Sequence, residues 1–193
     1  MDGVVVDLVG GVLSLYGVDP TLASQVSSWG GIPAVVSAHS QYQVTSQGLW
    51  ATVGHAGPAF WADLQPYPWA VDLYQLCAKH GVLVCSTPAS PGSAAGKLAW
   101  LSKWLPDASA CLVSAPGSFQ HPPQPTSVKR LLGRPGALLV DDHPQTCQAF
   151  ELASGESFTW PAPWNGGVCT LTLEAHHSAG WQALERLRCL LDG

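Results

Sequence analysis

Charged residues are scarce in this chain, and basic residues are the scarcest. Only 11% of its 193 residues are Asp, Glu, Lys or Arg, and the eight Lys and Arg residues form no run. An extended nucleic-acid surface needs clustered cations, so we expect none, although one phosphate could still be held locally. Hydrophobic residues make up 47%, which is enough for a sizeable core, so we expect one folded domain rather than disorder.

Other signals are missing as well. No apolar run is long enough to cross a membrane and no signal-peptide pattern is present, so we expect a cytoplasmic protein. The six cysteines form no C-x-x-C pair, which favours reduced, mostly buried thiols. No histidine has the spacing of a zinc ligand. The sequence does not decide the oligomeric state, and a homodimer stays open.

Short apolar runs alternate with helical patterns through much of the chain. This alternation predicts an α/β fold, a Rossmann-like parallel sheet with helices on both faces. The expected strands are residues 81–85, 110–113, 136–140 and 169–173, and the main expected helices are 69–80, 93–105, 146–153 and 177–191. The proline-rich segment 114–126 is expected to be a loop.

Residues 16–65 interrupt the alternation. They are rich in Gly, Ser, Pro and scattered aromatic residues. We expect an irregular insertion with its own small aromatic cluster. Residues 1–15 and 66–193 would then form the core, and residues 16–65 would form a cap over it.

Polar residues stand where two of these strands would end, and at the start of the chain, where a further strand would precede Met1. They are Asp2, the pair Ser86–Thr87 and the pair Asp141–Asp142. In parallel α/β sheets ligands bind beyond the carboxyl ends of the strands. Three carboxylates repel one another unless a cation lies among them, and oxygen-only ligands favour Mg²⁺.

The hydroxyl and amide groups of Ser86 and Thr87 could bind a phosphate, and Lys129, just before the third strand, adds an ammonium group. A metal, hydroxyl groups and one ammonium group around a phosphate are what phosphoryl transfer requires. Each element alone is common in turns, helix caps and solvated surfaces. Their order and spacing carry the prediction.

In that order, these elements resemble the motifs of the haloacid-dehalogenase-like (HAD-like) phosphatases, in particular the 5′-nucleotidase branch that includes the 5′(3′)-deoxyribonucleotidases. Residues 1–7, Met-Asp-Gly-Val-Val-Val-Asp, are similar to the tail of the first motif of that branch, D-M-D-G-V-x-x-D. The likeness covers nearly the whole chain and is weakest over residues 16–57. The other matching segments are 84–88, 97–101, 129–136, 138–144 and 158–165.

The resemblance implies a Mg²⁺-dependent hydrolase of nucleoside 5′-monophosphates, with deoxyribonucleotides as a candidate subset. Asp2 would be the general acid and base and a metal ligand, beside the metal ligands Asp141 and Asp142. An aspartate immediately before Met1 would be the nucleophile that forms an aspartyl-phosphate, and the chain as given lacks it.

For the substrate, the resemblance implies that Ser86, Thr87 and Lys129 bind the phosphate. Phe60 and Trp61 would lie near the nucleobase, where aromatic rings stack on different bases alike. Packing within the cap is an equal alternative for these two rings.

Three interpretations stay open. Translation could start upstream, with Met1 as the internal Met of the D-M-D-G motif, so that the longer chain is the active one. The protein could instead be a non-catalytic HAD-like protein that binds a phosphate or a metal. It could also be a phosphatase for another small phosphomonoester, because a cap sets specificity and this segment matches least. This exact chain is expected to be inactive.

Overall fold

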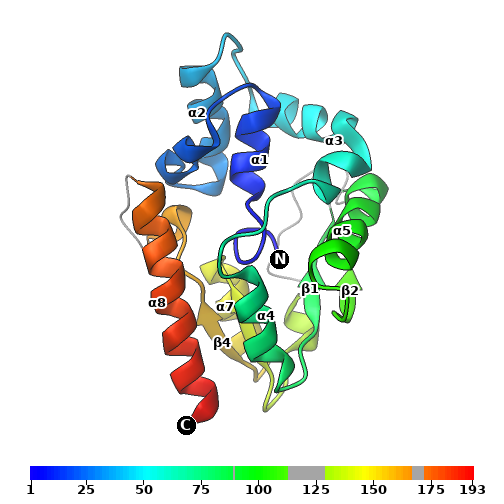
Figure 1. Ribbon diagram of the computed structural model, residues 1–193, viewed down its shortest axis with the longest axis vertical. Helices are drawn as coiled ribbons and strands as arrows, with labels where there is room; N and C mark the ends of the chain where they lie inside the picture. Colours follow the sequence, from blue (N-terminus) through cyan, green and yellow to red (C-terminus); the bar gives the residue numbers. More distant parts are fainter. Residues whose placement is uncertain (89, 113–128, 167–171) are drawn as a thin grey trace.

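The computed structural model describes residues 1–88, 90–112, 129–166 and 172–193 (Figure 1). It is mixed α/β, with mostly helices and parallel strand pairs, so the predicted class is confirmed. The α-helices are α1 (Leu8–Leu15), α2 (Ile32–His39), α3 (Ser46–Ala62), α4 (Ala70–Ala78), α5 (Pro91–Trp104), α7 (Pro144–Glu151) and α8 (Leu173–Asp192). The 3-10 helices are η1 (Pro20–Gln25), η2 (Trp29–Gly31), η3 (Arg130–Leu132) and η4 (Pro163–Asn165).

The strands form two parallel pairs. β1 (Val84–Ser86) pairs with β2 (Ala110–Leu112), and β3 (Leu138–Asp141) pairs with β4 (Glu156–Thr159). Within the described residues no ladder joins one pair to the other, so the predicted single Rossmann-like sheet is not confirmed. The sequence does not predict β4, because it is short and both of its end residues are exposed rather than apolar and buried.

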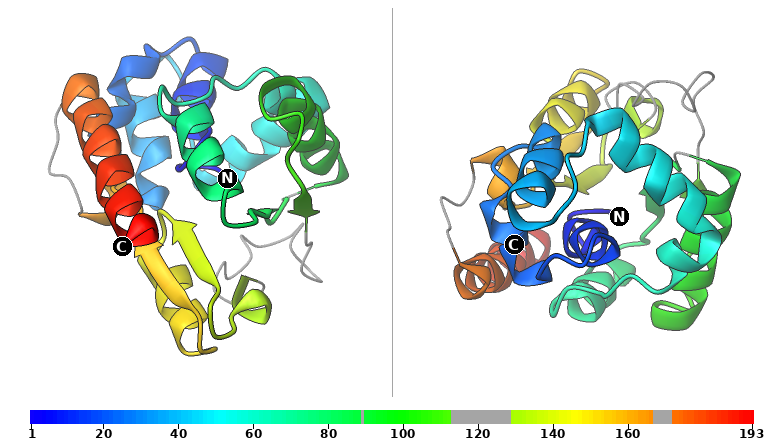
Figure 2. Two further views of the ribbon diagram at one scale, coloured as in Figure 1. Left: turned by 60° about the horizontal axis from the view of Figure 1, so that its bottom comes forward. Right: turned by 90° about the horizontal axis from the view of Figure 1, so that it is seen from above.

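The first six residues form a closed loop beside the N label in Figure 1, and Figure 2 shows the N-terminus surrounded by the other elements of the molecule. The amide of Val5 donates to the carbonyl of Met1 at 3.0 Å, and the amide of Gly3 donates to the carbonyl of Val6 at 3.0 Å. Gly3 has a φ of +74°, a conformation that glycine adopts without steric cost. This residue therefore allows the chain to turn back on itself before α1 begins.

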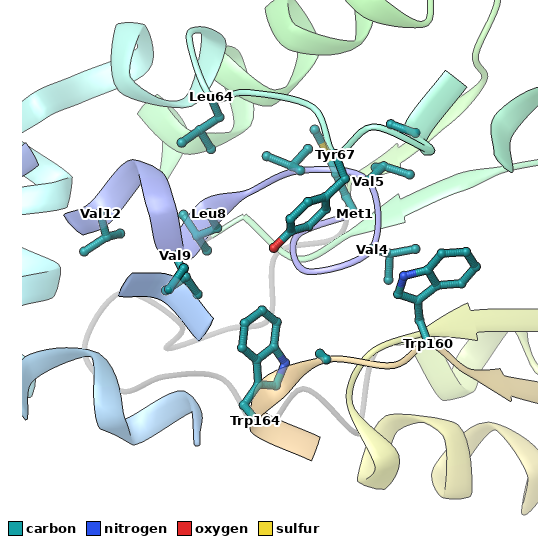
Figure 3. Close-up of a cluster of buried hydrophobic side chains, with 14 of the residues drawn as sticks. Met1, Val4, Val5, Leu8, Val9, Val12, Leu64, Tyr67, Trp160 and Trp164 are labelled. Carbon is teal, nitrogen blue, oxygen red and sulfur yellow. The ribbon is translucent and has the colours of Figure 1, made fainter. Parts of the chain in front are cut away.

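Apolar side chains of this loop and of α1 lie at the centre of the core. Figure 3 shows them surrounded by Tyr67, Trp160 and Trp164, which come from distant parts of the chain. The indole nitrogen of Trp69 donates to the carbonyl of Val4 at 2.7 Å. Packing and this buried hydrogen bond fix the loop, and with it the position of Asp2.

Residues 16–65 are mostly helical, so the expected irregular structure is wrong. They contain η1, η2, α2 and α3. Gly57, with a φ of +70°, interrupts α3, and Pro58 follows it, so part of the Gly and Pro content marks a helix break. The buried side chains of Ile32 and Leu49 belong to the same hydrophobic cluster as those of α1. The division into a core and a cap stays a prediction.

The other predicted elements are largely confirmed. The expected helices correspond to α4, α5, α7 and α8, and three expected strands correspond to β1, β2 and β3. The strand expected at 169–173 is wrong at Leu173, which begins α8. Residues 169–171 and the loop expected at 114–126 lie outside the described residues. Across the described residues, no helix combines the length and the apolar character needed to span a bilayer.

Candidate functional site

Lys97 on α5 joins the N-terminal loop to the end of β1. Its ammonium group pairs with Oδ2 of Asp2 and donates to the hydroxyl of Ser86 at 2.9 Å. The same ammonium group lies over the ring of Trp61, 4.9 Å from the centroid, a cation–π contact. The Lys97 side chain is only 2% exposed, and a lysine is almost never buried so fully unless it is paired.

Local sequence sets the position of α5. Ser90 caps the helix in a reciprocal pair of hydrogen bonds with Ser93, at 2.9 and 3.0 Å, and this capping box satisfies backbone donors of the first turn. Gly96 then lets α5 approach α3 closely, because a Cβ there would lie 2.3 Å from the carbonyl oxygen of Pro58. This close approach brings Lys97 against Trp61.

Lys129 and Asp141 form a second buried ion pair. The Lys129 ammonium contacts Oδ2 of Asp141, whose Oδ1 accepts from the amide of His143 at 3.0 Å. Burial lowers the pKa of Lys129, but Asp141 and then Asp142 outweigh it, and the pKa is raised overall. Lys129 is therefore a cation at neutral pH.

Asp142 follows β3 and is held by the segment around η4. The indole nitrogen of Trp164 donates to Oδ2 of Asp142 at 2.6 Å, and the side-chain amide of Asn165 donates to the Asp142 carbonyl at 2.8 Å. Burial and the neighbouring Asp141 raise the pKa of Asp142 to about 7. A Cβ on Gly3 would lie 2.3 Å from Oδ2 of Asp142. The N-terminal loop therefore lies against the end of β3 as well as reaching the end of β1 through Lys97.

The side chains of Asp2, Ser86, Lys97, Lys129, Asp141 and Asp142 form one polar cluster, and the amino group of Met1 lies within it. Burial lowers its pKa, as does Lys129, whereas Asp2 and Asp141 act in the opposite direction. For Asp2, burial raises the pKa, but Lys97 and the Met1 amino group outweigh this and hold the pKa below its usual value. Asp2 is therefore ionised at neutral pH. Its Oδ1 is buried and has no hydrogen-bond partner among the described residues.

The oxygen donors of Asp2, Asp141 and Asp142 are of the kind that Mg²⁺ prefers. Among the described residues, however, no three carboxylate, His or Cys side chains converge closely enough to hold a metal ion. Lys97 and Lys129 neutralise two of the carboxylates instead. A divalent cation would change two features of this cluster. It would give the unpartnered Oδ1 of Asp2 a positive partner, and it would lower the raised pKa of Asp142.

The remaining candidates are less closely connected to this cluster. Thr87 is half-buried after β1 and makes no side-chain hydrogen bond within the part of the chain that the structure describes. The Trp61 side chain is 4% exposed. It contacts the cluster through the Lys97 ammonium group, which lies over its ring. Phe60 is half-buried and packs edge-on against Trp61, with centroids 5.3 Å apart. A role for either ring at a nucleobase stays a prediction.

Lys97 is the main residue that the sequence interpretation did not assign to the site. Lys97 is part of the sequence prediction only as the first residue of segment 97–101, one of the segments that resemble the HAD-like phosphatases. Its position does carry a signal, because Trp100 and Leu101 follow at i+3 and i+4 and both are buried, which places Lys97 on the apolar side of the helix. A lysine there needs an acidic partner, and Asp2, 95 residues away, provides it.

Replacing Trp164 by Phe is expected to destabilise the protein by about 1.5–3 kcal/mol, the usual value of a hydrogen bond to a charged group. Trp160→Phe is the matched control, because this fully buried indole has no hydrogen-bond partner in the described parts of the chain. Urea unfolding at pH 8, where Asp142 is mostly ionised, should show the larger loss for Trp164→Phe. Equal losses would contradict a role for the Trp164–Asp142 hydrogen bond.

Two lysines, three aspartates and one serine, drawn from five separate parts of the chain, thus meet around the N-terminal loop. No family model and no curated protein sequence matches the chain.

Proposed function

We propose that this protein is a Mg²⁺-dependent phosphomonoester hydrolase for nucleoside 5′-monophosphates, with deoxyribonucleotides as a candidate subset. The observation that carries the proposal is the meeting of Asp2, Ser86, Lys129 and Asp141–Asp142 at one place. These are the residues that match the motifs of the HAD-like phosphatases, and they are far apart in the sequence.

We also propose that the fold is a HAD-like core with a cap. A HAD-like core would place the parallel pairs β1–β2 and β3–β4 on the two sides of the N-terminal loop. In its support, Ser86 ends β1 and Asp141 ends β3, and both side chains make contacts within the cluster. Residues 16–65 would be the cap.

The substrate phosphate would be bound by the hydroxyl of Ser86 and the ammonium group of Lys129, with Thr87 beside them. Lys129 would exchange part of its contact with Asp141 for the phosphate oxygens. Mg²⁺ would be held by Asp2, Asp141 and Asp142, and it would supply charge neutralisation at the phosphate. The Lys97 ammonium would keep Ser86 and Asp2 in place.

Asp2 would transfer protons. As an ionised carboxylate it can accept a proton from water that attacks a phosphorylated aspartate. To protonate the leaving nucleoside oxygen it must first carry a proton. The dianionic phosphate of a bound substrate would favour that form, because a nearby negative charge raises the pKa of a carboxyl group.

The nucleophile would be an aspartate joined to Met1. A residue preceding Met1 would extend from an amino group that lies among Asp2, Asp141, Lys97 and Lys129. A carboxylate there would face two ammonium groups, which favour its ionised, nucleophilic form. Its attack on phosphorus would release the nucleoside, and hydrolysis of the aspartyl-phosphate would release inorganic phosphate.

The test compares two chains that are extended before Met1 by Val-Asp or by Val-Asn. We expect Mg²⁺-dependent release of phosphate from nucleoside 5′-monophosphates by the first chain and none above background by the second. Faster release from sugar phosphates than from nucleotides would favour the phosphatase for another small phosphomonoester. Absence of release from every substrate by the Asp chain would refute the hydrolase.

A non-catalytic phosphate- or metal-binding protein is the second candidate. The observation in its favour is that Asp2 and Asp141 each already have a lysine partner. It predicts that the Val-Asp chain binds nucleotides but releases no phosphate from them.

A further inference from the structure

Two thiols lie side by side on β1 and β2, next to the cluster. Cys85 and Cys111 are the middle residues of the two strands and are paired in register. Parallel strands lie about 4.8 Å apart, and residues paired in register point to the same face of the sheet. Both residues are half-buried free thiols. Figure 1 shows the two strands adjacent to each other.

The electrostatic surroundings also place the two sulfur atoms close together. Burial raises the pKa of Cys85, and a hydrogen bond to the Cys111 thiol acts in the same direction, whereas the nearby Lys129 lowers it. In turn, Cys85 is one of the groups that raise the pKa of Lys129. Cys85 therefore lies near the proposed phosphate-binding lysine.

We propose that Cys85 and Cys111 are a modification site that forms a reversible disulfide with low-molecular-weight disulfides as the oxidant. One thiolate attacks a sulfur of the oxidant and releases one thiol molecule. The second protein thiolate attacks the mixed disulfide and releases the other. The protein loses two electrons and two protons, and the oxidant becomes two thiols.

The strand geometry permits this bond. Disulfides join residues whose Cα atoms are about 4.4–6.8 Å apart, and the spacing of neighbouring strands falls within that range. The favoured Cβ separation is only about 3.5–4.5 Å, so side chains that stand parallel on neighbouring strands must lean together. A bond formed this way is strained and readily reduced, as in regulatory disulfides.

Formation of the bond would affect the proposed phosphate side of the site. Ser86 follows Cys85 directly and accepts the hydrogen bond from Lys97. A covalent link between the strands would fix the end of β1 and remove the Cys85 thiol from the surroundings of Lys129. The other described cysteines are on helices: Cys77 on α4, Cys147 on α7 and Cys189 on α8.

The experiment exposes the chain to oxidised glutathione at pH 8.5, alkylates the remaining thiols and analyses the intact mass and the non-reduced peptides. We expect a protein lighter by two hydrogen atoms, with one linked peptide pair that contains Cys85 and Cys111. Dithiothreitol should restore the original mass. The raised pKa of Cys85 predicts that the reaction slows as the pH is lowered.

Variants make the assignment specific. Cys111→Ser should carry a glutathione adduct on Cys85 instead of the internal bond, whereas Cys77→Ser should form the bond as the original chain does. Separate glutathione adducts on Cys85 and Cys111, a linked pair that contains other cysteines, or an unmodified Cys85 would each overturn the proposal. None of these outcomes depends on whether the protein hydrolyses nucleotides.

Discussion

Lys97→Met is expected to lower the free energy of unfolding by about 3–5 kcal/mol at neutral pH, because removal of one partner of a buried ion pair leaves the other charge uncompensated. The remaining charge would be Asp2, whose Oδ1 is already without a partner in the described residues. Methionine keeps most of the length of the side chain, so little of the loss would come from packing. Urea unfolding measures the difference.

The pH dependence of this loss identifies its cause. In the original chain the pKa of Asp2 is held below its usual value, so the ionised form stabilises the fold above pH about 4, and this contribution is lost as the pH falls. Without Lys97, burial would dominate and raise the pKa of Asp2, so its ionisation would oppose folding. The difference between variant and original should therefore shrink as the pH is lowered towards 4.

Lys103→Met is the matched control on the same helix. Lys103 is exposed and only contacts the ring of Trp104, 5.2 Å from its centroid, so the change should cost less than about 1 kcal/mol. Similar losses for the two variants, or a loss for Lys97→Met that does not change with pH, would contradict the assigned role of the Asp2–Lys97 pair.

Gly3→Ala is expected to cost about 2–5 kcal/mol, for two separate reasons. A positive φ disfavours alanine by about 1–2 kcal/mol, and Gly3 has a φ of +74°. The new Cβ would also lie 2.3 Å from Oδ2 of Asp142 and 2.9 Å from the ring of Trp164. Overpacking of this kind costs about 1–3 kcal/mol more.

Gly17→Ala separates the two reasons. Gly17 has a φ of +68°, but its Cβ would meet nothing within 4 Å, so only the backbone cost applies. Thermal or urea unfolding of both variants gives the cost of the steric clash by difference. Equal losses would mean that the N-terminal loop does not pack on Asp142 as described.

The sequence predicts the regular part of this fold well, because its signals are local. The apolar spacing of α4 ends at Gly81, which has a φ of +78°, and Pro91 stands in the first turn of α5. The N-terminal loop could not be predicted in this way. Val4, Val5 and Val6 favour a strand, and only the turn at Gly3 and the packing against Trp69 and Trp160 make them a loop.

In the candidate site, too, the sequence predicts some features and not those that depend on contacts between distant elements. The order of the motifs predicts that Asp2, Ser86 and Asp141 belong together, and Lys129 does pair with Asp141. The pairing of Asp2 with Lys97 joins residues on different elements, so no local pattern contains it. The sequence also predicts clustered carboxylates around a metal, whereas the structure gives Asp2 and Asp141 lysine partners.

A calorimetric titration of a nucleoside 5′-monophosphate, with Mg²⁺ present, into the chain as it stands tests most directly whether this cluster binds a phosphate. We predict binding at a single site that Lys103→Met leaves unchanged. Lys129→Met should weaken binding about 10- to 100-fold, the equivalent of one charged hydrogen bond, in a variant that thermal unfolding shows to be folded. Absence of binding, or binding that Lys129→Met leaves unchanged, would contradict the claim that this cluster is a phosphate site.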